Sequence, residues 1–337
     1  MSKLLLIGFD GMDYFMTQKT IREYSFKSIQ PILKKQITKE SLTGPSWASF
    51  YTGLDKDVHG VIDGWGRDTK GSNSFRDIQR YAFWNIIKKK GYKVWIDNLP
   101  ITPNGFPFTT LKRKDIVNWV YKPLEGGMVH WRETIRGMSF DKMLSQVRSD
   151  SFKLIEGKRL ADRDLIFIQF SFLDRIGHVF TYKEDEIMRK SYTLAYELID
   201  RLCEIIAPQY LIVTSDHGFW KSTRGHDFAN CAVAILNDKT YRFFIKNKIF
   251  KFLSITNILI LVKMYRRILR NLSFSEILRY TFHCNYVKQT DFFDVIFLMF
   301  HIQYEKKVRK IEKSSVTRKA SNEEKMIQEK LERLGYI

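Results

Sequence analysis

Asp, His and Thr side chains that could hold divalent metal ions or act as a nucleophile occur in five short segments of this sequence. Asp10 lies in GFDG, and Asp174 stands four residues before His178 in FLDRIGHVF. The segments VTSDHGF and TRGHDFAN contribute the last three of six metal-competent side chains, namely Asp216, His217 and His226. Carboxylate oxygens and imidazole nitrogens are the ligands that dinuclear hydrolytic sites use.

The placement of these side chains favours a shared site. A single aspartate at the end of a strand is most often a turn former or helix cap, and a lone histidine is most often structural. Here, however, the groups follow several different apolar runs, with Asp10 after the first run and the two Asp-His pairs after later ones. Together they predict a site for two metal ions.

A candidate nucleophile lies in SLTGPSWASFYTG, which is the fifth segment. Thr43 precedes a Gly-Pro turn and a helix predicted over Ser46 to Tyr51. Its hydroxyl would then lie near a helix N-terminus, where backbone N–H groups favour an anionic oxygen. The alternative is that Thr43 or Ser46 is a plain helix cap, and the local sequence by itself favours the cap.

The elements that must position these groups form an α/β pattern. Apolar runs over Lys3 to Phe9, Asp164 to Phe172 and Gln209 to Thr214 indicate buried strands, and apolar residues at helical spacing indicate helices over Tyr81 to Lys90 and Glu186 to Ile206. We therefore predict an α/β fold with a mostly parallel central sheet flanked by helices. Functional groups in such sheets gather beyond the carboxyl ends of the strands.

Composition divides the chain into four predicted parts. The stretch from Arg67 to Asp162 is rich in Gly, Pro and Trp with weak periodicity, and the stretch from Lys239 to Ala320 carries 18 Lys/Arg against 5 Asp/Glu, a net of +13 out of +19. The predicted parts are a catalytic core at 1–66 and 163–238, a cap or insertion at 67–162, a basic apolar helical insertion at 239–288, and the C-terminal part of the core with a terminal helix at 289–337.

The three cysteines, Cys203, Cys231 and Cys284, are odd in number and far apart, which predicts neither a disulfide framework nor a thiolate metal site. The apolar run Leu4 to Ile7 is too short for a secretory signal, so we expect a cytoplasmic protein.

The order of the motifs resembles a known family. GFDG, TGPSWASFYTG, HG, DRIGH, SDHGF and GHDFAN follow one another as in the type I phosphodiesterase/nucleotide pyrophosphatase branch of the alkaline phosphatase superfamily. In that family a threonine followed by x-Pro is the nucleophile, and a His-Gly pair comes sixteen residues later. Thr43 and His59 keep this spacing. The resemblance covers residues 1 to 66 and 164 to 235.

This resemblance implies a metal-dependent phosphohydrolase. By it, one divalent ion is held by four residues, Asp10, Thr43, Asp216 and His217, and a second is held by Asp174, His178 and His226. It also implies a phosphothreonine intermediate on Thr43, and two zinc ions as the usual metals. Mn²⁺ and Fe²⁺ suit the same ligands.

One departure from the family pattern leaves the substrate preference open, and the nucleophile segment argues against a sulfatase. Many nucleotide pyrophosphatases have an asparagine just after the His-Gly pair that binds a phosphate oxygen, and Gly64 stands at the matching position here. The preference for diesters over monoesters, and for nucleotides, is therefore open. Sulfatases of the superfamily use Cys-x-Pro-Ser-Arg, whereas Thr43 to Trp47 lacks both the cysteine and the arginine. Phosphopentomutase-like and phosphoglycerate mutase-like enzymes have different nucleophile segments.

The basic region leaves a second class of function open. Residues 240–286 could form amphipathic helices that pack on the sheet, an element that lies on an anionic membrane at its inner face, or a nucleic-acid surface, in falling order of preference. The leading hypothesis is hydrolysis of a phosphodiester, nucleotide or lipid-linked, or of a phosphomonoester. The alternative is a non-catalytic metal-containing protein that binds a membrane surface or nucleic acid. No pattern identifies the substrate or the oligomeric state.

Overall fold

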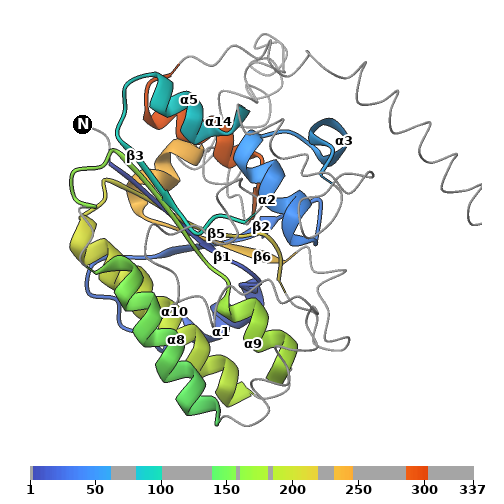
Figure 1. Ribbon diagram of the computed structural model, residues 1–337, viewed down its shortest axis with the longest axis vertical. Helices are drawn as coiled ribbons and strands as arrows, with labels where there is room; N and C mark the ends of the chain where they lie inside the picture. Colours follow the sequence, from blue (N-terminus) through green and yellow to red (C-terminus); the bar gives the residue numbers. More distant parts are fainter. Residues whose placement is uncertain are drawn as a thin grey trace, which may run out of the picture.

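The computed structural model describes residues 3–61, 81–100, 139–156, 160–180, 185–218, 231–245 and 286–302. They form a seven-stranded sheet with helices on both faces (Figure 1). The strands are β1 (Leu4–Phe9), β2 (Ile32–Ile37), β3 (Val94–Asp97), β4 (Leu165–Phe170), β5 (Tyr210–Ser215), β6 (Ala232–Leu236) and β7 (Tyr286–Lys288). The predicted fold class is confirmed, and the three predicted strands appear as β1, β4 and β5.

The strand order is β3-β4-β1-β5-β6-β2-β7. β1 lies at the centre and pairs in parallel with β4 and β5, while β6 runs antiparallel to both β5 and β2. β7 is parallel to β2, so six of these seven strands point the same way. Their carboxyl ends therefore meet at one edge of the sheet.

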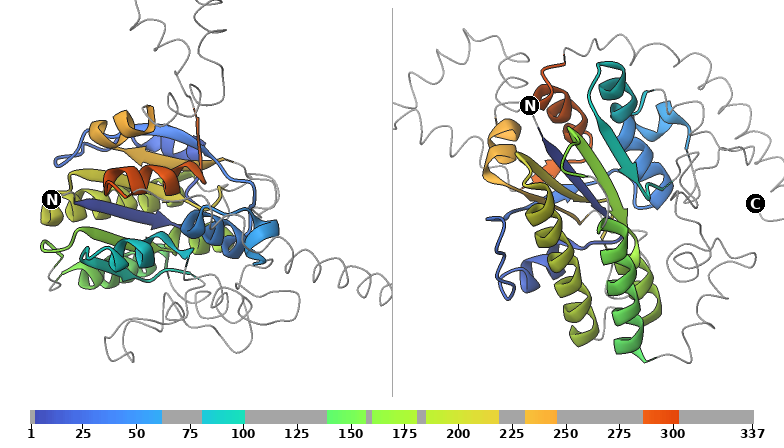
Figure 2. Two further views of the ribbon diagram at one scale, coloured as in Figure 1. Left: turned by 90° about the horizontal axis from the view of Figure 1, so that it is seen from above. Right: turned by 60° about the vertical axis from the view of Figure 1, so that its left-hand side comes forward.

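The helices labelled in Figure 1 lie in two layers (Figures 1 and 2). One layer holds α1 (Tyr14–Thr20), α8 (Phe140–Ile155), α9 (Phe172–Phe180) and α10 (Asp185–Ile206). The other holds α2 (Thr43–Thr52), α3 (Lys56–His59), α5 (Phe83–Lys89) and α14 (Asp291–Met299). The predicted helices over 81–90 and 186–206 appear as α5 and α10.

Alternation along the central strand explains why both faces are covered. Leu5 and Ile7 of β1 belong to the apolar cluster beneath α8 and α10, whereas Leu4 and Leu6 belong to the cluster beneath α2, α5 and α14. Successive side chains of a strand point to opposite faces, so a strand that is apolar at every position needs a helical layer on each side.

Helix α2 packs against β1 at an unusually short distance. A Cβ atom on Gly8 would lie 2.6 Å from Cη2 of Trp47, so only glycine allows the helix to lie this close. The helix begins at Thr43 and not at Ser46 as predicted. Pro45 is compatible with this earlier start because the first N–H groups of a helix have no acceptor within it.

Several predicted segments lie partly or wholly outside the described residues. Within the predicted cap at 67–162, the described residues 81–100 and 139–156 form α5, β3 and α8, which belong to the sheet and its helical layers. Most of the predicted basic insertion lies outside the described residues, and the division into four parts stays a prediction. Among the described helices, none has the length and apolar character that crossing a membrane requires.

Candidate metal and nucleophile site

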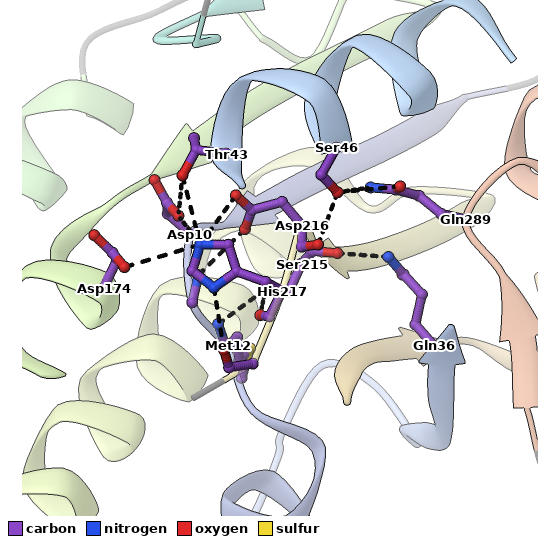
Figure 3. A network of polar contacts seen from close by, with 12 residues as sticks. Asp10, Met12, Gln36, Thr43, Ser46, Asp174, Ser215, Asp216, His217 and Gln289 are labelled. Atoms are coloured by element: carbon purple, nitrogen blue, oxygen red, sulfur yellow. Dashed lines mark hydrogen bonds and ion pairs between the residues drawn. The ribbon is translucent and has the colours of Figure 1, made fainter. Parts of the chain in front are cut away.

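Five of the candidate side chains lie together at the carboxyl edge of the sheet (Figure 3). Asp10 directly follows β1, and Asp216 and His217 directly follow β5. Thr43 is the first residue of α2, and Asp174 lies in the first turn of α9, the helix after β4. Three adjacent parallel strands and two helix starts thus converge on one place, as the rule for open α/β sheets predicts.

His217 lies at the centre of this cluster. Its Nε2 atom is 3.1 Å from Oδ1 of Asp10, 3.4 Å from Oδ2 of Asp216 and 3.9 Å from Oδ1 of Asp174. The same nitrogen lies 3.5 Å from the hydroxyl oxygen of Thr43, which in turn is 3.4 Å from Oδ1 of Asp10. One imidazole nitrogen therefore faces three carboxylates and a hydroxyl.

The other ring nitrogen of His217 determines its tautomer. Nδ1 lies 3.2 Å from the carbonyl oxygen of Gly218, an acceptor only, so Nδ1 carries a proton. The lone pair of the neutral ring is then on Nε2, the form in which histidine binds a metal ion. Burial by itself would lower the pKa of His217, but the nearby carboxylates, Asp216 first, raise it to about 10.

The surroundings of Asp216 also favour a bound cation. Its side chain is fully buried, and burial together with the neighbouring charge of Asp10 raises its pKa well above the usual range. Oδ1 accepts the N–H of Gly11 at 3.2 Å, whereas Oδ2 makes no hydrogen bond and has only the ring of His217 as a charged partner, 3.4 Å from Nε2. A buried carboxylate oxygen of this kind is costly unless a positive charge lies beside it.

These groups fit a bound divalent metal ion. One ligand atom from each of three buried residues, Asp10, Asp216 and His217, lies within 4.8 Å of the other two. Of the residues that the resemblance assigns to a second ion, Asp174 lies beside this group, 3.9 Å from His217. The backbone of His178 is in α9, but its side chain is outside the described residues, and so is all of His226.

Thr43 does not act as a helix cap. The N-cap of α2 is Leu42, and no side chain makes a capping hydrogen bond there. The Ser46 hydroxyl, the other candidate cap, instead donates to the carbonyl oxygen of Asp216 at 2.7 Å. The capping alternative is therefore wrong for both residues, because one hydroxyl faces Asp10 and His217 and the other bonds to the end of β5.

Buried side chains that the sequence analysis missed hold the backbone that carries the ligands. The carbonyl oxygens of three consecutive residues, Ser215, Asp216 and His217, accept hydrogen bonds from Gln36 Nε2, Ser46 Oγ and Ser215 Oγ in turn. Ser215 Oγ also accepts the N–H of Met12 at 2.9 Å and so connects the end of β5 to the loop after β1. Gln36 and Ser46 carry no local sequence signal for this role, since their partners are more than 150 residues away.

His59, the histidine of the His-Gly motif, is the last residue of α3 and contacts α2 through Ser49. It does not belong to the metal cluster. It is 2% exposed, its Nδ1 accepts the N–H of Val61 at 3.1 Å, and its Nε2 lies 3.0 Å from Oγ of Ser49. Since Nδ1 accepts, Nε2 carries the proton of the neutral ring. Burial lowers the pKa of His59 to about 4, so the ring is neutral at pH 7.

The comparison with protein families supports the resemblance that the motifs indicate. The family model for type I phosphodiesterase/nucleotide pyrophosphatase matches residues 4–249. None of the curated proteins matches the chain. A solved structure of murine ectonucleotide pyrophosphatase/phosphodiesterase 5 is 17% identical, with 64% of this chain and 57% of that chain covered and a TM-score of 0.37.

A second similar structure is phosphonoacetate hydrolase from Sinorhizobium meliloti 1021 in complex with phosphonoformate. It is 14% identical, with 64% of this chain and 56% of that chain covered and a TM-score of 0.40. The present chain thus spans less than two thirds of either protein. The family match, by contrast, covers most of this sequence, including Asp10, Thr43 and Asp216. The chain belongs to the type I phosphodiesterase/nucleotide pyrophosphatase family.

Proposed function

We propose that this protein is a metal-dependent hydrolase of phosphoester bonds with Thr43 as its covalent nucleophile. The observation that carries the proposal is the position of the Thr43 hydroxyl at the start of α2, 3.4 Å from Oδ1 of Asp10 and 3.5 Å from Nε2 of His217. Family membership supports the same class of reaction. A hydroxyl in this place lies beside the groups that would hold a metal ion, which is where a nucleophile must be activated.

The proposal includes two divalent metal ions, with Zn²⁺ as the first choice and Mn²⁺ or Fe²⁺ as alternatives. Asp10, Thr43, Asp216 and His217 would hold one ion, and Asp174, His178 and His226 would hold the other. Bound ions of this kind lower the pKa of a coordinated hydroxyl or water and stabilise charge on phosphoryl oxygens. The buried, unbonded oxygen of Asp216 and the tautomer of His217 support the first set.

The chain's own groups account for the covalent step. Oγ1 of Thr43 gives its proton to solvent water and bonds to phosphorus while the bond from phosphorus to the leaving oxygen breaks, and the leaving oxygen takes up a proton from the solvent. Water then cleaves the phosphothreonine and restores the hydroxyl. The first N–H groups of a helix have no acceptor within it, so the start of α2 favours the anionic phosphoryl oxygens beside Thr43.

Hydrolysis of bis-p-nitrophenyl phosphate and p-nitrophenyl phosphate by the metal-loaded protein tests this function. We expect Thr43→Ala to lower kcat by about 10³-fold or more, chelation to abolish activity, and Thr43→Ser to retain part of it because a hydroxyl remains. Acid quenching during turnover should trap a phosphate on Thr43 from the monoester, or a p-nitrophenyl phosphate from the diester, detectable by peptide mass spectrometry. Undiminished turnover by Thr43→Ala would refute the assignment of the nucleophile.

The proposed substrate is a phosphodiester or a phosphomonoester, and no narrower class is proposed. The ratio of the two chromogenic activities reports the preference, because Gly64 lacks the amide that many relatives of this family place near a phosphate oxygen. The non-catalytic alternative depends on the basic segment 240–286, most of which lies outside the described residues. Cytoplasmic location, and attachment to the inner face of a membrane, are likewise proposals.

A further inference from the structure

The described C-terminal residues 286–302 lie beyond the end of the family match at residue 249. They nevertheless complete the sheet and one helical layer through β7 and α14. Gln289 directly follows β7, which runs parallel to β2, and its N–H donates to the carbonyl oxygen of Ile37 at 3.1 Å. Gln289 therefore emerges at the same edge of the sheet as the candidate metal cluster.

The side chain of Gln289 contacts the cluster through one intermediate residue. Nε2 of Gln289 lies 2.9 Å and Oε1 lies 3.1 Å from Oγ of Ser46 (Figure 3). Ser46 Oγ is only 2.7 Å from the carbonyl oxygen of Asp216, to which it donates its single proton. The amide N–H of Gln289 is then the group that can pair with Ser46, which gives a chain of hydrogen bonds from Gln289 through Ser46 to Asp216.

The same segment supports the far end of helix α2. Gly53 ends this helix at φ +65°, and a Cβ atom there would lie 2.6 Å from Cγ of Phe293. The ring of Phe292 also packs against Phe50, with 5.6 Å between centroids. Helix α2, which carries Thr43 at its start, is thus held near both ends by residues 289–293.

We propose that Gln289 is a positioning residue for the metal site, an inference that rests on the proposed function. A serine hydroxyl rotates freely unless its lone pairs and its proton are both engaged. The Gln289 amide donates to Ser46 Oγ and so directs the Ser46 proton to the Asp216 carbonyl oxygen. This fixes the end of β5 against α2 and sets the separation between Thr43 and Asp216. Groups that orient a ligand residue in this way tune its affinity for metal.

The burial of the chain of hydrogen bonds supports this role. Ser46 is fully buried and Gln289 is 3% exposed, so water does not compete for either side chain. A buried polar group is retained only where its partners satisfy it, and its loss leaves the remaining partner unpaired. Removal of the amide should therefore alter the Ser46–Asp216 contact and leave the apolar contacts of Phe292 and Phe293 in place.

The affinity of the full-length, metal-free protein for Zn²⁺, measured by competition with a chromogenic chelator, tests the inference. We expect Ser46→Ala to weaken binding by about 10- to 100-fold, the range typical of groups that orient metal ligands. Gln289→Met, which keeps the side-chain volume but has no amide, should weaken it by roughly 5-fold. In the double variant, Gln289→Met should add nothing to Ser46→Ala, because the amide acts only through the hydroxyl.

Thr240→Ala is the matched control. The buried Thr240 hydroxyl accepts the N–H of Leu211 at 3.0 Å, at the opposite end of β5, so this variant removes a comparable hydrogen bond far from the site. It should lower thermal stability without changing Zn²⁺ affinity. Should Gln289→Met fail to fold, Gln289→Asn applies the same test, since its amide is one methylene too short to reach Ser46.

Wild-type affinity in Gln289→Met, or an equal loss in the Ser46→Ala background, would overturn the positioning role. A wild-type protein that binds Zn²⁺ but hydrolyses neither chromogenic ester would refute the proposed function, while the affinity comparison would still decide the role of Gln289. A wild-type protein with no affinity for Zn²⁺, Mn²⁺ or Fe²⁺ would overturn both.

Discussion

The buried ring of His59 should make the protein lose stability in mildly acidic solution. Its pKa falls from the ordinary 6.5 to about 4 on folding, because burial penalises the charged ring. Between these two values the unfolded chain binds a proton that the folded protein does not, so the free energy of unfolding decreases as the pH falls through this window. Above pH 6.5 both states are neutral, and the effect vanishes.

The pKa difference fixes the size of the effect. A shift of about 2.5 pKa units corresponds to roughly 3 kcal/mol once both states are protonated. At pH 5, where only the unfolded state is mostly protonated, the loss relative to pH 7.5 is about 2 kcal/mol. His59 is 2% exposed, so solvent screening reduces this figure little.

Urea unfolding of wild type and His59→Gln at pH 7.5 and 5.0, with chelator present, measures this contribution. We expect the variant to be less stable than wild type at pH 7.5. Because glutamine does not titrate, its free energy of unfolding should fall by about 2 kcal/mol less than that of wild type on acidification. The difference between the two proteins cancels the contributions of the carboxylates at the metal site. Parallel pH dependence of the two proteins would refute the assignment of a buried, neutral His59.

Three further predictions concern packing around helix α2 and the electrostatics of the site. Gly8→Ala should lower the free energy of unfolding by about 2 kcal/mol, since its Cβ would lie 2.6 Å from the buried indole of Trp47, and chemical denaturation measures this. Gly53→Ala should lower the melting temperature more than Gly91→Ala, and paired melting curves measure the difference. Both glycines have positive φ, but of the two only Gly53 would bring its Cβ against another side chain. Asp216→Asn should abolish tight Zn²⁺ binding yet raise the melting temperature of the metal-free protein, because it removes a buried negative charge close to Asp10. A lower melting temperature for that variant would contradict the repulsion inferred here.

Patterns that are local in sequence predicted much of the fold. The strands β1, β4 and β5 are continuous apolar runs, and α5 and α10 repeat apolar residues at helical spacing. The start of α2 was predicted three residues too late, because the Gly-Pro pair reads as a turn although proline is also compatible with a first helical turn. Four strands were not predicted. β2 carries lysines, β3 and β7 have only four and three residues, and β6 is an apolar run of five residues that was missed.

The residues that gather at the candidate site were predicted in part. Asp10, Thr43, Asp174, Asp216 and His217 were selected from their positions in the sequence, and the structure brings their side chains together. Their roles as ligands and nucleophile stay predictions. The polar side chains that hold them were not predicted, because a hydrogen bond across 170 or 243 residues, as Ser46 makes to Asp216 and to Gln289, has no periodic signature.

The metal-free cluster opposes its own assembly, which explains why so many buried donors surround it. Asp10 and Asp216 are acidic groups held close together away from water, and the repulsion between them works against the attraction of each to the ring of His217. The side-chain hydrogen bonds to the carbonyl oxygens of Ser215, Asp216 and His217 hold the backbone without involving the carboxylate of Asp216 or the ring of His217. Since these donors come from β2, α2 and the end of β5, the ligand positions depend on how the sheet edge and α2 pack. A change at Gln289 should therefore reach the ligands by moving the backbone, without any contact with the metal.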